Sequence, residues 1–116
     1  MSYSFRPAHT LSIKSAGAIS AHRFVTATGA QAGADANTFG VSLASAAGAG
    51  EQVPVIVLGT ATVEAGAAIS AGATVKSDAS GRAIPWATAG AKVGIALEAA
   101  AGAGEMIEVF LVPNAA

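Results

Sequence analysis

Histidine and carboxylate side chains are the groups in this sequence best suited to catalysis or metal binding, and they are few. His9 and His22 together with Asp35 have the chemistry of a metal site. Metal sites in proteins draw three or four such ligands, at characteristic spacings. No such spacing is present here, and no further ligand stands out. We therefore predict no metal site at these residues.

Glu51 and Glu105 form a second candidate, because each follows a Gly-Ala-Gly segment. A pair of carboxylates can act as general acid and general base. These two glutamates, however, occupy equivalent positions in two similar segments, whereas an acid and a base need different environments. We interpret them as the ends of two turns, where each carboxylate bonds backbone N–H groups or neighbouring charges.

The glycine-rich segments and Lys76 give no stronger catalytic signal. Residues 48–50 and 102–104 lack the third glycine and the lysine of nucleotide-binding loops, and no G-x-S-x-G segment is present. The segment 63–76 is spaced like the turn of biotinyl or lipoyl carrier domains, but Lys76 lacks the usual methionine neighbours. A carrier domain modified at Lys76 stays an alternative. Our prediction is a protein that is not an enzyme, with no catalytic residue, metal or cofactor.

The composition narrows the class of partner. The 116 residues carry a formal net charge of −1 and only 11% charged residues, so no basic field attracts nucleic acid. The chain has no cysteine for a disulfide framework, and no apolar run approaches the roughly 18 residues of a membrane span. More than half of the hydrophobic residues are alanine, which buries little apolar surface. So small a core favours docking on a larger body or on further copies of the chain.

The strongest pattern is an internal repeat. Residues 40–51 match residues 94–105 at an offset of 54, and residues 18–21 match residues 68–71 at an offset of 50. The second copy therefore holds four extra residues, around Ser80–Thr88, and an insertion between matching flanks is expected in a loop.

These matches divide the chain. We predict an N-terminal arm and first strand entry at residues 1–12, followed by a single β domain at 13–116. The domain consists of two tandem units, residues 13–61 and 63–115.

Each unit is predicted to contain short strands separated by turns. The eight expected strands cover residues 10–14, 23–28, 39–44, 53–58, 60–64, 73–77, 92–99 and 106–112. Alternation of apolar residues marks one buried face on each strand, formed by Val93, Ile95 and Leu97 in one strand and by Ile107, Val109 and Leu111 in another. We predict an all-β fold, a small barrel or sandwich of about eight strands built from two tandem, pseudo-symmetric units.

Two local choices accompany this prediction. The alanine-rich segment 96–103 has helical propensity, but Gly102 and Gly104 favour a hairpin loop there. Pro54 lacks a backbone donor, so its strand is expected to lie at a sheet edge or to begin near this residue.

Features without a counterpart in the other unit are the best candidates for a specific contact. Tyr3, Phe5, Arg6 and Pro7 precede the first unit, and aromatic and arginine side chains dominate the energetics of interfaces. Arg82 and Trp86 lie in the inserted loop. A carbohydrate- or ligand-binding β-module that uses Trp86 is a further alternative.

The segments Ile69–Asp78, followed by Gly81, and Lys92–Leu111 resemble small tailed-phage capsid decoration (cement) proteins. In that family a G-x-A-L-x-A-A strand, present here at Gly94–Ala100, follows a Gly/Asp turn and precedes an alternating apolar strand. The resemblance covers about residues 40–112.

The resemblance implies a β-fold that binds the outer surface of a phage capsid and stabilises contacts between major capsid subunits. It implies the major capsid protein and further copies of the chain, as a dimer or trimer, as partners, without nucleic acid or membrane. The implied location is the virion, after synthesis in the host cytoplasm.

Overall fold

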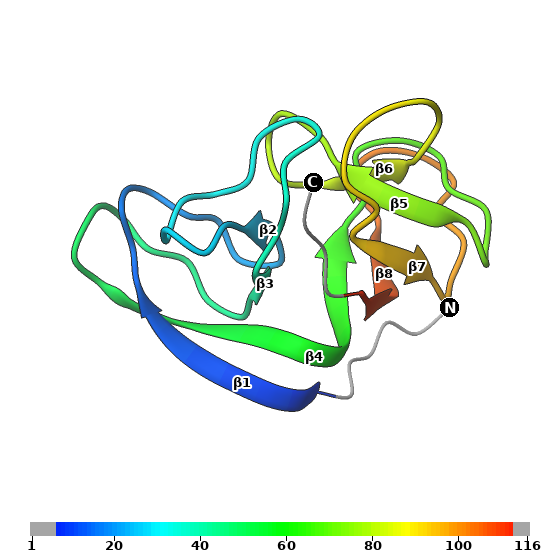
Figure 1. Ribbon diagram of the computed structural model, residues 1–116. Coiled ribbons are helices and arrows are strands. Elements are labelled where there is room, and N and C mark those ends of the chain that lie inside the picture. The colour runs from blue at the N-terminus through cyan, green and yellow to red at the C-terminus, as the bar shows by residue number, and fades with distance from the viewer. Residues whose placement is uncertain (1–6, 113–116) are drawn as a thin grey trace.

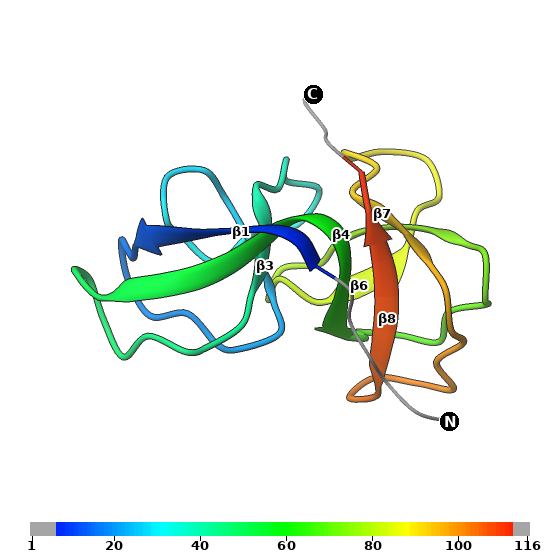
Figure 2. The same cartoon turned by 90° about the horizontal axis from the view of Figure 1, so that it is seen from below.

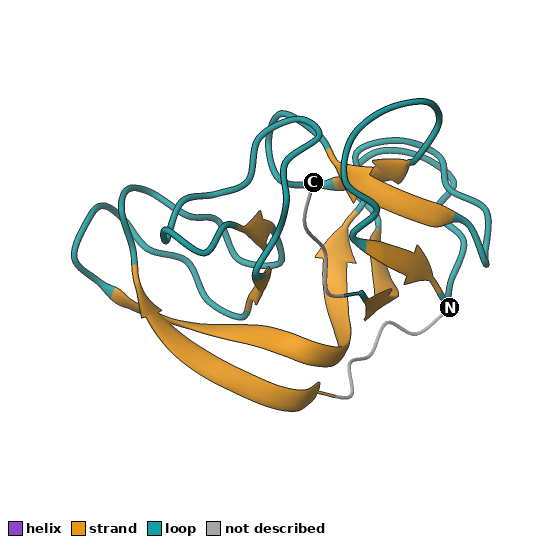
Figure 3. Cartoon of the chain, in the orientation of Figure 1, coloured by secondary structure: helices purple, strands orange, loops and turns teal. Residues whose placement is uncertain are grey.

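The computed structural model describes residues 7–112, which form eight β-strands and no helix (Figures 1 and 3). The strands are β1 (Pro7–Lys14), β2 (Phe24–Val25), β3 (Gly40–Ser42), β4 (Gln52–Glu64), β5 (Thr74–Ser77), β6 (Ala83–Pro85), β7 (Gly94–Ala96) and β8 (Met106–Leu111). The sheet follows the order β2-β3-β4-β8-β7-β5-β6, β1 pairs with β4, and the whole is barrel-like. The all-β prediction is confirmed. Within the described residues, no helix long and apolar enough to cross a membrane occurs.

Strand β4 connects the two halves of the molecule. Its 13 residues combine two strands that we expected to be separate, and Gly59 between them has a φ of 95°. The first part of β4 pairs with β1 and β3, and the second part pairs with β8. One continuous backbone therefore belongs to two sheet regions, as Figure 2 shows.

Pro54 lies near the beginning of β4 but not at a sheet edge. The strand has β1 on one side and β3 on the other. The Pro54 carbonyl accepts a hydrogen bond from the N–H of Leu43, one residue beyond the end of β3. Because the pairing with β3 ends at this point, the missing donor of the proline is tolerated.

Strand pairs in the two halves have related registers. Ile13 pairs with Val53 in the first half and Val63 pairs with Ile107 in the second, which are the offsets of 50 and 54 found in the sequence. The same offsets relate the pair Val25–Gly40 of β2 and β3 to the pair Val75–Gly94 of β5 and β7. The offsets of the sequence repeat thus recur in the strand registers. The division into two tandem units stays a prediction, and we call residues 13–61 the first unit and residues 63–115 the second unit.

The two equivalent glycines of this set occupy close approaches between strands. A Cβ atom added to Gly94 would lie 2.7 Å from the carbonyl oxygen of Phe110, and one added to Gly40 would contact the carbonyl oxygen of Ile56. Each glycine therefore permits a neighbouring backbone to approach where a side chain would separate the strands.

Both Gly-rich segments form hairpin loops, as predicted, between β3 and β4 and between β7 and β8. In the first loop the Glu51 carboxylate accepts hydrogen bonds from the N–H groups of Ala47 (3.0 Å) and Gly48 (3.2 Å). This is the architectural role expected for Glu51.

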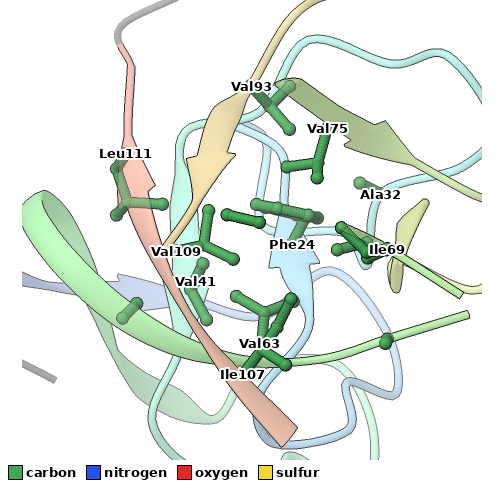
Figure 4. Close-up of a cluster of buried hydrophobic side chains, with 14 of the residues drawn as sticks. Phe24, Ala32, Val41, Val63, Ile69, Val75, Val93, Ile107, Val109 and Leu111 are labelled. Carbon is green, nitrogen blue, oxygen red and sulfur yellow. The ribbon is translucent and has the colours of Figure 1, made fainter. Parts of the chain in front are cut away.

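The core has two clusters of buried side chains. The smaller cluster lies within the first unit and is formed by Ile19, Val25, Ala46, Val53 and Val55. The larger cluster contains the interior of the second unit together with Phe24, Val41 and Ile56 of the first (Figure 4). Phe24 is completely buried there, so the first unit supplies the largest side chain of the core that it shares with the second.

The inserted loop contains an unexpected strand. β6 pairs with β5 around a turn in which the Asp78 carboxylate accepts hydrogen bonds from the N–H groups of Ser80 (2.8 Å) and Arg82 (2.9 Å). Hydrogen bonds from backbone N–H groups to an aspartate side chain stabilise a tight turn. The turn reaches the first unit, since the carbonyl of Gly81 accepts a hydrogen bond of 2.8 Å from the N–H of Phe24.

Replacement of Phe24 by alanine is expected to lower the free energy of unfolding by about 3–5 kcal/mol, the usual range for a buried aromatic ring. Urea unfolding followed by circular dichroism measures this loss. Leu58→Ala is the control, because Leu58 is 45% exposed and its truncation is expected to change the stability by only about 0.5 kcal/mol. Equal losses in the two variants would contradict a central role for Phe24.

Candidate functional site

The N-terminal arm lies mostly outside the described residues. Tyr3, Phe5 and Arg6 fall in this part, whereas Pro7 is the first residue of β1 and its backbone pairs with Gly59 at the middle of β4. The arm is therefore attached where the two halves of β4 meet.

Arg82 belongs to an ion-pair network that connects the two units. Its side chain contacts the carboxylates of Asp78 (3.2 Å) and Glu64 (3.7 Å). Glu64 also pairs with Arg23 of the first unit at 3.1 Å, and Arg23 donates to the carbonyl of Ser80 at 2.9 Å. Much of the charge of Arg82 is thus engaged within the chain.

Trp86 follows β6 and is fixed by three contacts. Its Nε1 donates to the carbonyl of Gly90 at 2.9 Å, and its backbone N–H donates to Thr74 at 2.9 Å. The Lys92 ammonium lies 4.5 Å from the ring centroid, within the range of a cation–π contact. Trp86 and Lys92 therefore form a small platform beside the exposed loop 87–90.

The structure does not bring Arg82 and Trp86 together. They flank the three residues of β6 on opposite ends, and four steps along a strand span roughly 13 Å. Of the two residues that we singled out in the inserted loop, Arg82 faces the first unit and Trp86 lies beside the following loop.

Lys76 lies within β5 and not at a hairpin tip. Its ammonium contacts the Asp35 carboxylate at 2.7 Å and the carbonyl of Ala89 at 3.1 Å, and only 15% of its side chain is exposed. A carrier lysine must present its amine to a modifying enzyme. This geometry does not favour the carrier alternative.

The residues considered for metal binding are dispersed. Among residues 7–112 no group of three or more His, Asp or Glu side chains could hold a metal ion. His22 contributes instead through its backbone, whose N–H donates to Ser42 and whose carbonyl accepts from Glu64. It has a φ of 63°, and its Nδ1 is buried without a hydrogen-bond partner.

One exposed surface was not predicted from the sequence. The side chains of Ile95 and Leu97 are 37% and 46% exposed, although the alternation with Val93 assigned all three to a buried face. That assignment is correct for Val93 and wrong for the other two. In β7 the buried positions are Gly94, which has no side chain, and Ala96, which has only a methyl group.

Phe110 extends this surface on the neighbouring strand. It is the cross-strand partner of Ile95 and is 46% exposed. We call Ile95, Leu97 and Phe110 the β7–β8 patch. The alternation of Ile107, Val109 and Leu111 in β8 was assigned correctly, because all three are buried.

Comparison with known proteins gives two findings. A family model described as phage cement protein matches residues 5–111. A solved structure, the N base of head fiber gp8.5 of bacteriophage phi29, superimposes with a TM-score of 0.73 at 18% sequence identity, over 93% of this chain and 98% of that one. At this identity the superposition shows a shared fold. No curated protein matches the chain.

The ion-pair network generates a stability prediction. Glu64→Gln is expected to lower the free energy of unfolding by about 1–3 kcal/mol, since the partly buried guanidinium groups of Arg23 and Arg82 lose their shared carboxylate. Thermal unfolding measures the change, and Glu105→Gln, at an exposed position, is the control. If the two variants lose the same stability, the network does not hold the units together.

Proposed function

The chain belongs to the phage cement protein family, and on this premise we propose that it binds the outer surface of a phage capsid and stabilises contacts between major capsid subunits. The observation that carries the proposal is the family match, which spans residues 5–111 and thus every strand of the fold. The shared fold with a phage head fiber base supports it.

The size and charge of the protein are compatible with this role. Its extents are 36 × 29 × 23 Å, and its accessible surface is 5299 Å². A standard protein interface takes about 800 Å² from each partner, which is roughly a seventh of that surface. With 11% charged residues, the contact would depend on shape and apolar burial more than on electrostatic steering.

The proposed capsid contacts are the features that lack a counterpart in the other unit. Tyr3, Phe5, Arg6 and Pro7 form the proposed anchoring arm, attached beside the middle of β4. Trp86 contributes a second contact through its platform with Lys92. Arg82, with 30% of its side chain exposed, joins the contact at the edge of the inserted turn.

Several finer points belong to the same proposal. The protein is made in the host cytoplasm, associates with the major capsid protein and becomes part of the virion. It acts as a small homo-oligomer, and no chemical step is assigned to it.

The proposal predicts saturable binding to capsids. Purified protein mixed with phage heads that lack it is expected to co-sediment with them, up to a fixed number of copies per head. Because few charges are present, the affinity is expected to fall less than tenfold between low and physiological salt. Absence of co-sedimentation, or binding that never saturates, would overturn the proposal.

The arm gives a separate prediction. Deletion of residues 2–6, which leaves β1 intact from Pro7, is expected to reduce head occupancy at least tenfold at limiting protein, because the aromatic and arginine anchors are lost. Occupancy is measured by quantifying the protein in sedimented heads. Deletion of residues 114–116 is the matched control and should leave occupancy unchanged. Wild-type occupancy after deletion of residues 2–6 would remove the arm from the contact.

A further inference from the structure

Equivalent faces of the two units differ sharply in exposure. At the offset of 54, Val41, Leu43 and Ile56 of the first unit correspond to Ile95, Leu97 and Phe110, the β7–β8 patch. Cross-strand pairing agrees with this correspondence, because Val41 pairs with Ile56 as Ile95 pairs with Phe110.

The face of the first unit is covered by the second unit. Val41 and Ile56 are buried in the larger core cluster, and Leu43 packs against that cluster. The corresponding side chains of the second unit remain between 37% and 46% exposed. The two faces are both apolar, but only one of them is covered within the described part of the chain.

In a tandem array, a face that no neighbouring unit covers is normally polar, since an exposed apolar face causes association. The second unit does not follow this rule. An exposed antiparallel strand would be expected to carry polar residues on its solvent side, yet Ile95 of β7, Leu97 one residue beyond β7 and Phe110 of β8 lie there.

We infer that the β7–β8 patch is a homotypic interface, covered in solution by the same patch of a second copy of this chain. The argument is the equivalence of the two faces, because the matching face of the first unit is already buried against a unit of the same protein. The inference deepens the homo-oligomer of the proposed function and rests on it to that extent.

The contact between copies must differ from the contact between units. Within the chain, Phe24 fills the core of the second unit, and Arg23 pairs with Glu64. The equivalent positions at the offset of 50 are Thr74 and Ala73, which offer neither an aromatic anchor nor a charge. A head-to-tail repetition is therefore not available, whereas a symmetric contact lets one patch bury itself on both copies.

Sedimentation equilibrium of the full chain over a wide concentration range tests the inference. Phe110→Ser and Leu97→Ser remove apolar surface from the patch, and each is expected to weaken self-association about tenfold or more. Leu58→Ser is the matched control, because Leu58 has nearly the same exposure, 45%, but lies on β4 outside the patch. Circular dichroism verifies that each variant is folded.

The outcomes separate this inference from the proposed function. The inference is supported if the wild type and the Leu58→Ser variant self-associate while the Phe110→Ser and Leu97→Ser variants associate more weakly. This holds even if the protein does not bind heads. A monomeric wild type, or equal association of all variants, overturns it. If wild type is monomeric and Phe110→Ser loses only head binding, the capsid covers the patch. If instead only the chain lacking residues 2–6 self-associates, its own N-terminal segment covers the patch. Both results overturn the inference.

Discussion

The burial of Phe24 in the core of the second unit is the contact on which the rest of the structure depends. Its ring fills a space that the valines and alanines of the second unit leave open. Around it, Gly81 accepts a hydrogen bond from its backbone, and Arg23 beside it pairs with Glu64. Because alanine contributes so much of the apolar composition, neither unit has a large core of its own. The two units share one core cluster, to which the first contributes an aromatic side chain.

The sequence was informative where local patterns decide the structure. The Gly-rich segments form hairpin loops because turn formation is local, and the repeat offsets anticipate the strand registers residue by residue. The periodicity was less informative about burial. It identifies two faces of a strand, but the neighbours decide which face is covered, and small residues such as Gly94 and Ala96 can be the buried ones. For this reason Ile95 and Leu97 were assigned to the wrong face.

For the candidate contact residues, too, the sequence was informative about local features and less informative about burial. A comparison of repeats identifies Arg82 and Trp86 as features of one unit only, and the structure explains part of this difference. The turn that contains Gly81 and Arg82 packs against the first unit, and a contact of this kind belongs to only one of the two units. The β7–β8 patch was missed because it does have a counterpart, Val41 with Ile56, and the signal lies in the unequal burial of matching residues.

The pairing of β4 also determines how the molecule bears tension. Pro7 at the start of β1 pairs with Gly59, and Phe110 near the end of β8 pairs with the adjacent Thr60. The first and last described strands thus reach adjacent residues of one strand. A force applied between them would load the hydrogen-bond ladders that β4 makes with β1 and β8, and these strands also carry Val53, Val63 and Val109 of the two hydrophobic clusters. A tension between the first and last described strands would therefore be borne by the backbone ladders of β4 and by the packed side chains on the same strands together.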